Sequence, residues 1–293
     1  MAGVEIERIG PGAPRLLIEV PHGATRRSDY ARVVGELQSA LPVDLDHFFH
    51  VNTDEGAPEG ALAIANALAP HGIATIVARC TIPRTFIDTN RVVEAGASDG
   101  KLVAGMTPGL PGYITDPRDH ALLTAMHAAY HAAVAALYAE ACTANGGLAL
   151  QLHSYAPRSV GVEATDANIV AALHAAYEPA AYATWPERPP IDLIAATADG
   201  SFRCNPRLVA AVRAAYAAAG IRAEENATYH LHAITMGMHY ARAFPDRVLC
   251  VEMNRGLLGE PFLPFAESPI DAGKVARLTA PLVSVLAAEL SRR

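Results

Sequence analysis

The chain has 293 residues, of which 51% are hydrophobic and 18% are charged. A chain of this length and composition buries a substantial core, which excludes an intrinsically disordered protein. The net charge of -7 and the absence of a Lys/Arg-rich run argue against a surface for nucleic acid or anionic membrane, since both require concentrated positive charge. We therefore expect a small-molecule substrate and no nucleic-acid or membrane partner; the oligomeric state stays open.

The cysteines and the N-terminus bear on the cellular compartment. The four cysteines are scattered without a C-x-x-C pair, which indicates free thiols rather than a disulfide framework. The N-terminal segment has neither a basic region nor a long apolar core, and no uninterrupted apolar stretch reaches the roughly 18 residues that a membrane helix needs. These features predict a cytoplasmic protein.

Short apolar runs alternate along the chain with Ala-rich segments of helical periodicity. The runs are nearly continuous in apolar residues, which favours strands covered on both faces. In chain order we expect strand 15–20, helix 58–70, strand 72–80, helix 117–144, strand 147–155, helix 166–178, strand 191–197, helix 206–219, strand 247–254 and helix 272–291. Pro58, the pair Asp116-Pro117 and the glycines at 146–147 mark helix ends.

This alternation predicts an α/β fold with a mostly parallel or mixed central sheet and helices on both faces, formed by residues 1–293 as a single domain. Segments 92–116 and 179–190 both carry proline, and the first is rich in glycine. We expect both to be long surface loops that border a site.

The informative polar residues follow the predicted strands, where ligands bind in open α/β sheets. Two imidazoles and a carboxylate are the ligand set of a catalytic zinc, which keeps a fourth position open for water, and a further carboxylate serves as general base. The candidates are His22 after the first strand, Asp54 and Glu55 in "VNTDEGAPE", Asp88, Asn90 and Arg91 in "IPRTFIDTNR", His153 in "LALQLH", and Glu252, Asn254 and Arg255 in "VLCVEMNR".

Local context supports some of these candidates and leaves others open. Pro21 ends the first strand and Gly23 allows the backbone to turn, so His22 can project rigidly into the crevice. Asp54 can instead cap the helix that begins near Pro58. A structural role is harder to assign to Glu252, because it lies within an apolar run and burying an unpaired carboxylate is costly.

Other histidines have weaker claims. His127 and His131 stand one helical turn apart, but no acidic residue lies between them and their Ala-rich surroundings favour a packed or solvent-facing helix. His230 and His232 alternate on an extended segment, as pocket donors or as a polar strand edge. The absence of a G-x-S-x-G elbow and of a P-loop argues against serine hydrolases and nucleotide-dependent enzymes.

The arginines bear on the substrate. Arg84, Arg91 and Arg255 occur at element ends, the last two next to Asn90 and Asn254. A guanidinium binds carboxylates through two parallel hydrogen bonds, although a surface salt bridge is an alternative for each. The two "NR" pairs favour a small carboxylate substrate, and the same positive cluster would stabilise a developing oxyanion.

Four motifs together, "VPHG", "RTFIDTNR", "LQLHSY" and "VEMNRGLL", span residues 15–258. In this order they resemble the N-formylglutamate amidohydrolase family. The resemblance implies a fold like that of zinc carboxypeptidases and of the succinylglutamate desuccinylase and aspartoacylase group. It also implies metal-assisted hydrolysis of an N-acyl amino acid.

The resemblance can be carried over to this chain residue by residue, with two departures. The resemblance favours Asp54 over Glu55 as the acidic ligand. Two departures put the specificity for formylglutamate in doubt: Gly23 replaces the family's serine, and the glycine pair expected near 230 reads Tyr229-His230-Leu231-His232. The motif residues fall on His22, on Asp88, Asn90 and Arg91, on His153 and Ser154, and on Glu252, Asn254 and Arg255.

The resulting hypothesis is an amidohydrolase that uses Zn²⁺, or another divalent transition metal, with Glu252 as general base. The alternatives are a zinc carboxypeptidase-like peptidase and a non-catalytic carboxylate-binding protein. The ligands would be His22, His153 and Asp54 or Glu55; Arg84, Arg91 or Arg255 would bind the substrate carboxylate or polarise the acyl oxygen; Asn90, Asn254, His230 and His232 would complete the pocket.

Overall fold

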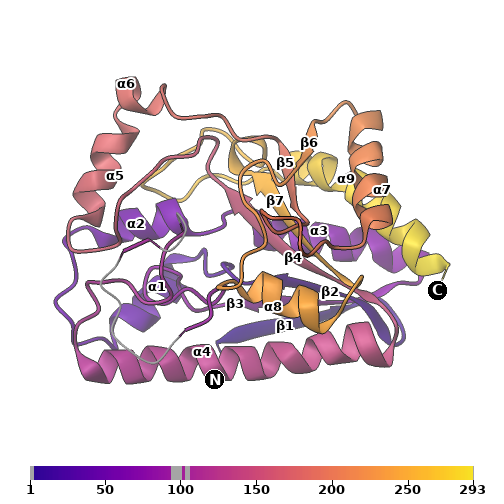
Figure 1. The fold of residues 1–293 in the computed structure, drawn as a ribbon, viewed down its shortest axis with the longest axis horizontal. Coiled ribbons are helices and arrows are strands. Elements are labelled where there is room, and N and C mark those ends of the chain that lie inside the picture. Colours follow the sequence, from indigo (N-terminus) through magenta and orange to yellow (C-terminus); the bar gives the residue numbers. More distant parts are fainter. Residues whose placement is uncertain (1–2, 94–100, 103–105, 293) are drawn as a thin grey trace.

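The computed structural model describes residues 3–93, 101–102 and 106–292, so part of the predicted loop 92–116 lies outside the described residues. Within them the strands form one mixed sheet in the order β1-β3-β2-β4-β7-β5-β6 (Figure 1). The strands are β1 (Val4–Ile9), β2 (Pro14–Val20), β3 (Ala74–Cys80), β4 (Leu148–Tyr155), β5 (Ile191–Ile194), β6 (Ala223–Glu225) and β7 (Val248–Asn254).

Strand direction divides the sheet into two parts. Strands β3, β2, β4 and β7 run parallel and form its centre. β1 pairs antiparallel with β3 at one edge, and β5 pairs antiparallel with β7 on the other side, followed by β6 parallel to β5. The first residues of β5 therefore lie beside the last residues of β7, with Ile191 opposite Met253.

Helices cover both faces of this sheet. They are α1 (Arg27–Val34), α2 (Leu45–Asn52), α3 (Ala57–Leu68), α4 (Pro117–Tyr138), α5 (Ile169–Tyr177), α6 (Pro179–Tyr182), α7 (Pro206–Ala218), α8 (Met236–Ala243) and α9 (Ala272–Ser291). Strand side chains alternate between the two faces. On one face Glu19 of β2 contacts α4, and on the other Leu152 and Met253 lie against Gly60 of α3, which packs on α9.

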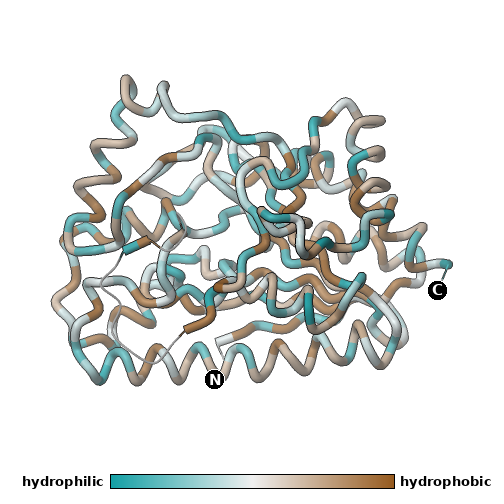
Figure 2. The backbone as a smooth tube through the Cα atoms, in the orientation of Figure 1, coloured by the Kyte–Doolittle hydropathy of each residue, from teal (hydrophilic) through white to brown (hydrophobic). Residues whose placement is uncertain are grey.

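The structure confirms the α/β fold with a mixed sheet, and each predicted strand and helix overlaps an observed one. Hydrophobic stretches run along the central strands, whereas the long helix α4 alternates between hydrophobic and hydrophilic residues (Figure 2). The predicted strand 191–197 ends earlier, at Ile194, because the amides of Ala195 and Ala196 donate to Oδ1 of Asn226 instead of to a strand partner. Strands β1 and β6 and helices α1, α2, α6 and α8 were not predicted.

The long Ala-rich helix bears on the prediction that the chain has no membrane helix. By length and composition, Pro117–Ala144 is long and apolar enough to cross a membrane. However, Tyr130 and Tyr138 donate to Glu19 in the sheet, and His131 bonds to the carbonyl of Thr89. These contacts are those of a helix packed on its own domain; the cytoplasmic location stays a prediction.

Candidate metal centre and active site

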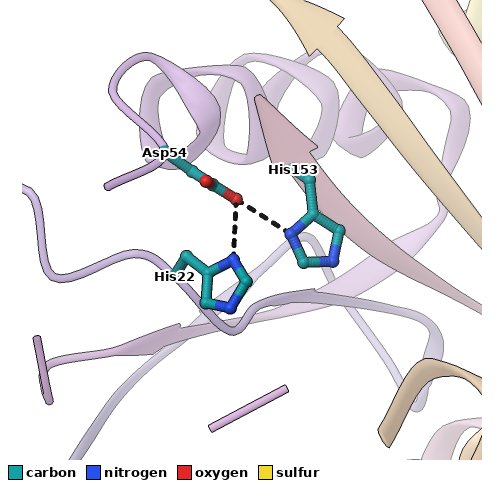
Figure 3. A group of neighbouring side chains, drawn as sticks. All are labelled: His22, Asp54 and His153. Atoms are coloured by element: carbon teal, nitrogen blue, oxygen red, sulfur yellow. Dashed lines mark hydrogen bonds and ion pairs between the residues drawn. The ribbon is translucent and has the colours of Figure 1, made fainter. Parts of the chain in front are cut away.

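Three side chains from separate elements converge at the carboxyl edge of the parallel strands (Figure 3). His22 follows β2, Asp54 lies in the turn between α2 and α3, and His153 lies near the end of β4. Oδ2 of Asp54 is 3.3 Å from Nδ1 of His22 and 2.8 Å from Nδ1 of His153. All three residues are at most 5% exposed. Among the described residues, they form the one group of three or more candidate metal ligands.

The turn after β2 holds His22 in place. The amide of Gly23 donates to the carbonyl of Val20 at 3.1 Å, and Nη1 of Arg79 donates to the carbonyl of Gly23 at 2.7 Å. Gly23 does not adopt a positive φ, but a Cβ there would lie 2.7 Å from Cγ of Arg79. The glycine is therefore needed for the close approach of Arg79 rather than for the turn that we expected.

The turn before α3 separates the two acidic candidates. The helix begins after Gly56, which has a φ of 84°, and no side chain caps it, so Asp54 is not the expected helix cap. Glu55 turns away: its Oε2 accepts from the amide of Ser268 at 3.3 Å, and its Oε1 is 3.5 Å from Nδ1 of His50. The carboxylate that faces both imidazoles is that of Asp54.

The outer nitrogens of both imidazoles have acceptors. Nε2 of His22 is 2.8 Å from Oδ1 of Asp88, and Nε2 of His153 is 3.3 Å from Oε1 of Gln151. The Gln151 amide donates through Nε2 to Glu19 at 3.0 Å, which fixes the orientation of its oxygen. With a metal bound, the proton of each imidazole would lie on Nε2, where Asp88 and Gln151 supply acceptors. Both Nδ1 lone pairs then point at the Asp54 carboxylate.

Three acceptor atoms that face one another repel unless a proton or cation lies between them. Among the described residues Nδ1 of His22 is buried with no hydrogen-bond partner. Two imidazole nitrogens and a carboxylate oxygen, with the outer nitrogens held by hydrogen-bond acceptors, match the donor set of a catalytic divalent metal. The residues present fit such an ion.

The electrostatics of the cluster also favour a cation. Burial and Arg84 oppose protonation of His22, but Asp88 and Asp54 outweigh them and raise the pKa of His22. Burial would raise the pKa of Asp54, but the neighbouring His22 and His153 lower it. Negative charge at Asp54 and Asp88 therefore attracts positive charge to the imidazoles.

Glu252 lies beside this cluster, at the position of β7 that pairs with His153 in β4. Burial raises the pKa of Glu252 to about 7, with His153 opposing the rise and Asp54 adding to it. Its Oε2 is buried and has no hydrogen-bond partner in the described part of the chain. A carboxyl with a pKa near neutrality can accept and return a proton at physiological pH.

A cavity of about 260 Å³ opens onto the cluster and onto Glu252, a volume suited to a small molecule. A family model described as N-formylglutamate amidohydrolase matches residues 15–258. The chain belongs to this family.

Two solved structures share the fold of this N-formylglutamate amidohydrolase family member. One, an N-formylglutamate amidohydrolase from Ralstonia eutropha JMP134, is 18% identical with a TM-score of 0.63, over 100% of this chain and 99% of that one. The other, a gene product of Agrobacterium tumefaciens, is 18% identical with a TM-score of 0.54, over 99% and 95%. None of the curated proteins matches the sequence.

Two of the predicted arginines of this family member share one carboxylate. Nε of Arg84 donates to Oδ2 of Asp88 at 2.9 Å, and Nη1 of Arg91 lies 3.6 Å from the same oxygen. Arg91 also donates to the carbonyls of Thr107 and Asn90, and its side chain is only 7% exposed, against 22% for Arg84. Arg84 is therefore the more accessible cation, while Arg91 mainly holds its own loop.

The "NR" pair after β7 has a supporting role that the sequence did not indicate. Arg255 donates from Nη1 to the carbonyls of His50 and Thr53, and from Nη2 to that of Val51, so it holds the end of α2. Asn254 donates to the carbonyl of Arg188 at 3.2 Å. Within the described residues Nε of Arg255 has no hydrogen-bond partner, and Arg255 lines the cavity, so its contact with a substrate stays a prediction, as does that of Asn254.

The side-chain amide of Asn90, in the other "NR" pair, lies between His153 and α8. Nδ2 of Asn90 is 3.5 Å from Nε2 of His153, and its Oδ1 accepts from the amide of Gly237 at 3.0 Å. Asn90 also lines the cavity, as we expected of a residue that contacts substrate.

The remaining histidines divide into cavity and structural residues. His230 is exposed and lines the cavity, whereas Nδ1 of His232 accepts from the amide of Ile234 within its own turn. His127 and His131 contact the carbonyls of Arg91 and Thr89, so they hold the loop after β3 rather than a metal.

Sequence reasoning missed two cavity residues that lie beside Tyr229. Arg188 and Tyr155 line the cavity, and Arg188 belongs to the predicted loop 179–190 that precedes β5. The signal that could have found Arg188 is the direction of β5: since β5 is antiparallel to β7, the residues before it lie at the active edge.

Proposed function

We propose that this protein, as one domain, hydrolyses the amide bond of a small N-acyl amino acid with zinc bound by His22, Asp54 and His153. The observation that carries the proposal is the convergence of the two Nδ1 atoms and one carboxylate oxygen beside Glu252 in a small cavity. Membership of the family, and the activity in the name of the Ralstonia structure, support this reaction class.

The side chains have separate tasks in the proposed reaction. When bound, zinc would supply Lewis acidity toward water and the acyl oxygen. Glu252 takes a proton from the attacking water and returns it to the amide nitrogen as the C–N bond breaks, so the products are a carboxylic acid and a free amino acid. Arg84 donates to the acyl oxygen as negative charge develops there, and Asp88 holds both Arg84 and His22 in position.

The nitrogen and oxygen donor set is compatible with other divalent transition metals. Each imidazole Nε2 is held by a hydrogen-bond acceptor, so Nδ1 remains as the ligand atom for zinc or for another of these ions. The test therefore begins with metal content rather than with activity.

We would measure the metal content of the purified protein and its His22→Ala and His153→Ala variants. We expect about one zinc per chain in the wild type and a loss in both variants. Asp54→Asn and Glu55→Gln form a matched pair: the first should lose zinc and the second should keep it. A wild type that binds no zinc after reconstitution would overturn the proposal.

Substrate assays then decide the reaction class. The zinc-loaded protein should release free amino acid from N-formyl or N-acetyl amino acids but not from dipeptides. Cleavage of dipeptides alone would instead identify a peptidase. Zinc binding without turnover of either set would leave a carboxylate-binding protein.

A further inference from the structure

Arg188 lies outside the predicted site, yet its guanidinium faces the same cavity. Its carbon Cζ is 4.9 Å from the ring centroid of Tyr155 and 5.4 Å from that of Tyr229. Nε donates to Oγ of Ser159 at 3.0 Å, and Nη2 donates to the hydroxyl of Tyr229 at 2.8 Å. The cation is thus held beside two aromatic rings.

The guanidinium keeps donors for a ligand. Of its five N–H groups, two are engaged in these bonds, and the structure's described residues take none of the hydrogens on Nη1. The pair of terminal nitrogens can therefore present one hydrogen each to the two oxygens of a carboxylate.

Arg188 differs from three other arginines that line the cavity, which pair with carboxylates. Arg84 and Arg91 share Asp88, and Arg158, another cavity residue, pairs with Glu187 at 2.8 Å. Within the described residues, no carboxylate lies at ion-pair distance from Arg188. A half-buried cation without a partner leaves a binding position for an anion in the cavity wall.

The main chain around Arg188 is fixed before any ligand binds. Its amide donates to the carbonyl of Pro157 at 2.9 Å, and its carbonyl accepts from Asn254 at 3.2 Å. The hydroxyl of Tyr155 donates to the carbonyl of Pro189 at 2.7 Å. Because the loop is already ordered, ligand binding does not have to order it.

The neighbouring aromatic residue is fixed as well. Asp192 is fully buried in β5, and its carboxylate accepts from the amides of Ala227 and Thr228 at 3.0 and 2.7 Å. These bonds hold the segment that leads into Tyr229, the residue at which this chain departs from the glycine pair that the family resemblance led us to expect.

We propose that Arg188 binds a carboxylate of the substrate beside Tyr155 and Tyr229, and thereby selects N-acyl amino acids over substrates that lack this carboxylate. The inference rests on the proposed function, which puts the scissile amide at the histidine cluster. Arg188, Glu252 and the histidine cluster line the same cavity, so a carboxylate bound at Arg188 lies near the reacting amide.

The test combines Arg188→Gln with removal of the carboxylate from the substrate. The three substrates are N-formyl-L-glutamate, N-formyl-L-glutamine and N-formyl-L-isoglutamine, the last two having an amide in place of one carboxylate each. In the wild type, replacing the bound carboxylate should raise KM by about 10- to 100-fold. In Arg188→Gln the same replacement should change KM by less than about 3-fold, because its partner is already gone.

Arg158→Gln is the matched control, since it removes the same charge from the wall of the same cavity. Nη1 of Arg158 donates to the carbonyl of Trp185 at 2.6 Å and Nη2 pairs with Glu187, so its donors are engaged. This variant should keep the wild-type ratio of KM between acid and amide. Tyr229→Phe, which loses one bond to Arg188, should shift that ratio partway.

Binding measurements separate this inference from the proposed function. A wild type that hydrolyses neither these three substrates nor the N-formyl and N-acetyl amino acids named above would count against the proposed function. Titration of the zinc-loaded protein with L-glutamate, L-glutamine and L-isoglutamine would still test Arg188, and we expect weaker binding of L-glutamate by Arg188→Gln. Three results would overturn the inference. The wild type and Arg188→Gln could bind L-glutamate with equal affinity, or the wild type could fail to bind it. The ratio of KM between acid and amide substrates could also be the same in Arg188→Gln as in the wild type.

Discussion

Gln151 connects a proposed zinc ligand to a fully buried carboxyl, and we predict that Gln151→Met weakens zinc binding. Its Oε1 lies 3.3 Å from Nε2 of His153 and its Nε2 donates to Glu19 at 3.0 Å. Methionine has nearly the same volume, so the substitution removes both hydrogen bonds without leaving a large cavity. His153 then loses the acceptor that orients its ring.

The expected magnitude follows from these contacts. Removing the hydrogen-bond partner of a metal-binding histidine lowers metal affinity by about 10- to 100-fold, which is about 1.4 to 2.8 kcal/mol. Glu19 also loses one of three donors, since Tyr130 and Tyr138 bond to it at 2.8 and 2.7 Å. We expect a further loss of about 1–3 kcal/mol in the free energy of unfolding of the zinc-free protein.

Two assays separate the effects. Competition with a chelator gives the zinc affinity, and urea denaturation of the zinc-free protein gives its stability. Tyr138→Phe is the matched control: it removes a donor from Glu19 but leaves the contact between Gln151 and His153 intact. It should lower stability and keep the wild-type zinc affinity. The reasoning is refuted if Gln151→Met binds zinc as tightly as the wild type, or if Tyr138→Phe binds it as weakly as Gln151→Met.

Three further changes test the base, a buried carboxylate and the turn at His22. Glu252→Gln should lower kcat by about 10²- to 10⁴-fold with zinc retained; an unchanged kcat removes Glu252 from the mechanism. Burial would raise the pKa of Asp119, but hydrogen bonds from Ser39 outweigh it and hold that pKa below its usual value. The ionised Asp119 therefore stabilises the folded protein above about pH 4, and this contribution is lost as pH falls through the folded pKa. Asp119→Ala should therefore cost about 1–3 kcal/mol at pH 7 and less at pH 3; urea titrations showing an equal cost at both pH values would contradict this. Gly23→Ala should lower the free energy of unfolding by about 1–3 kcal/mol because its Cβ would lie 2.7 Å from Cγ of Arg79; an unchanged Tm would show that Arg79 moves freely.

The parallel centre of the sheet was predictable because its strands are buried on both faces and read as continuous apolar runs. β1 has no such run: its sequence, "VEIERI", contains three charged residues and forms an edge strand with four exposed positions. Helix α2 and strand β6 are short, at eight and three residues, so their local patterns carry little signal.

The candidate cluster was predictable for a related reason. His22, His153 and Glu252 lie at or near the ends of parallel strands, and parallel strands bring these ends to one edge of the sheet. Arg255 follows one of the same strands, yet its donors bind carbonyls at the end of α2. The position of an arginine in the sequence indicates where its guanidinium lies, but not whether main-chain carbonyls already accept its hydrogen bonds. Here the helix that supplies those carbonyls, α2, was itself not predicted.

Arg188 shows why strand direction matters for the rest of the site. The rule that ligands meet the carboxyl ends of strands holds for β2, β4 and β7, but β5 runs antiparallel to them, so its amino end lies at the active edge. The direction of β5 depends on its pairing with β7, which is a long-range contact that local sequence does not encode. The proposed metal ligands and base thus come from the parallel strands and the turns that follow them, whereas the unpaired cation comes from the loop before an antiparallel strand. Because these two groups are held by different strands, substitutions in the loop can change which substrate carboxylate is bound without moving the histidines.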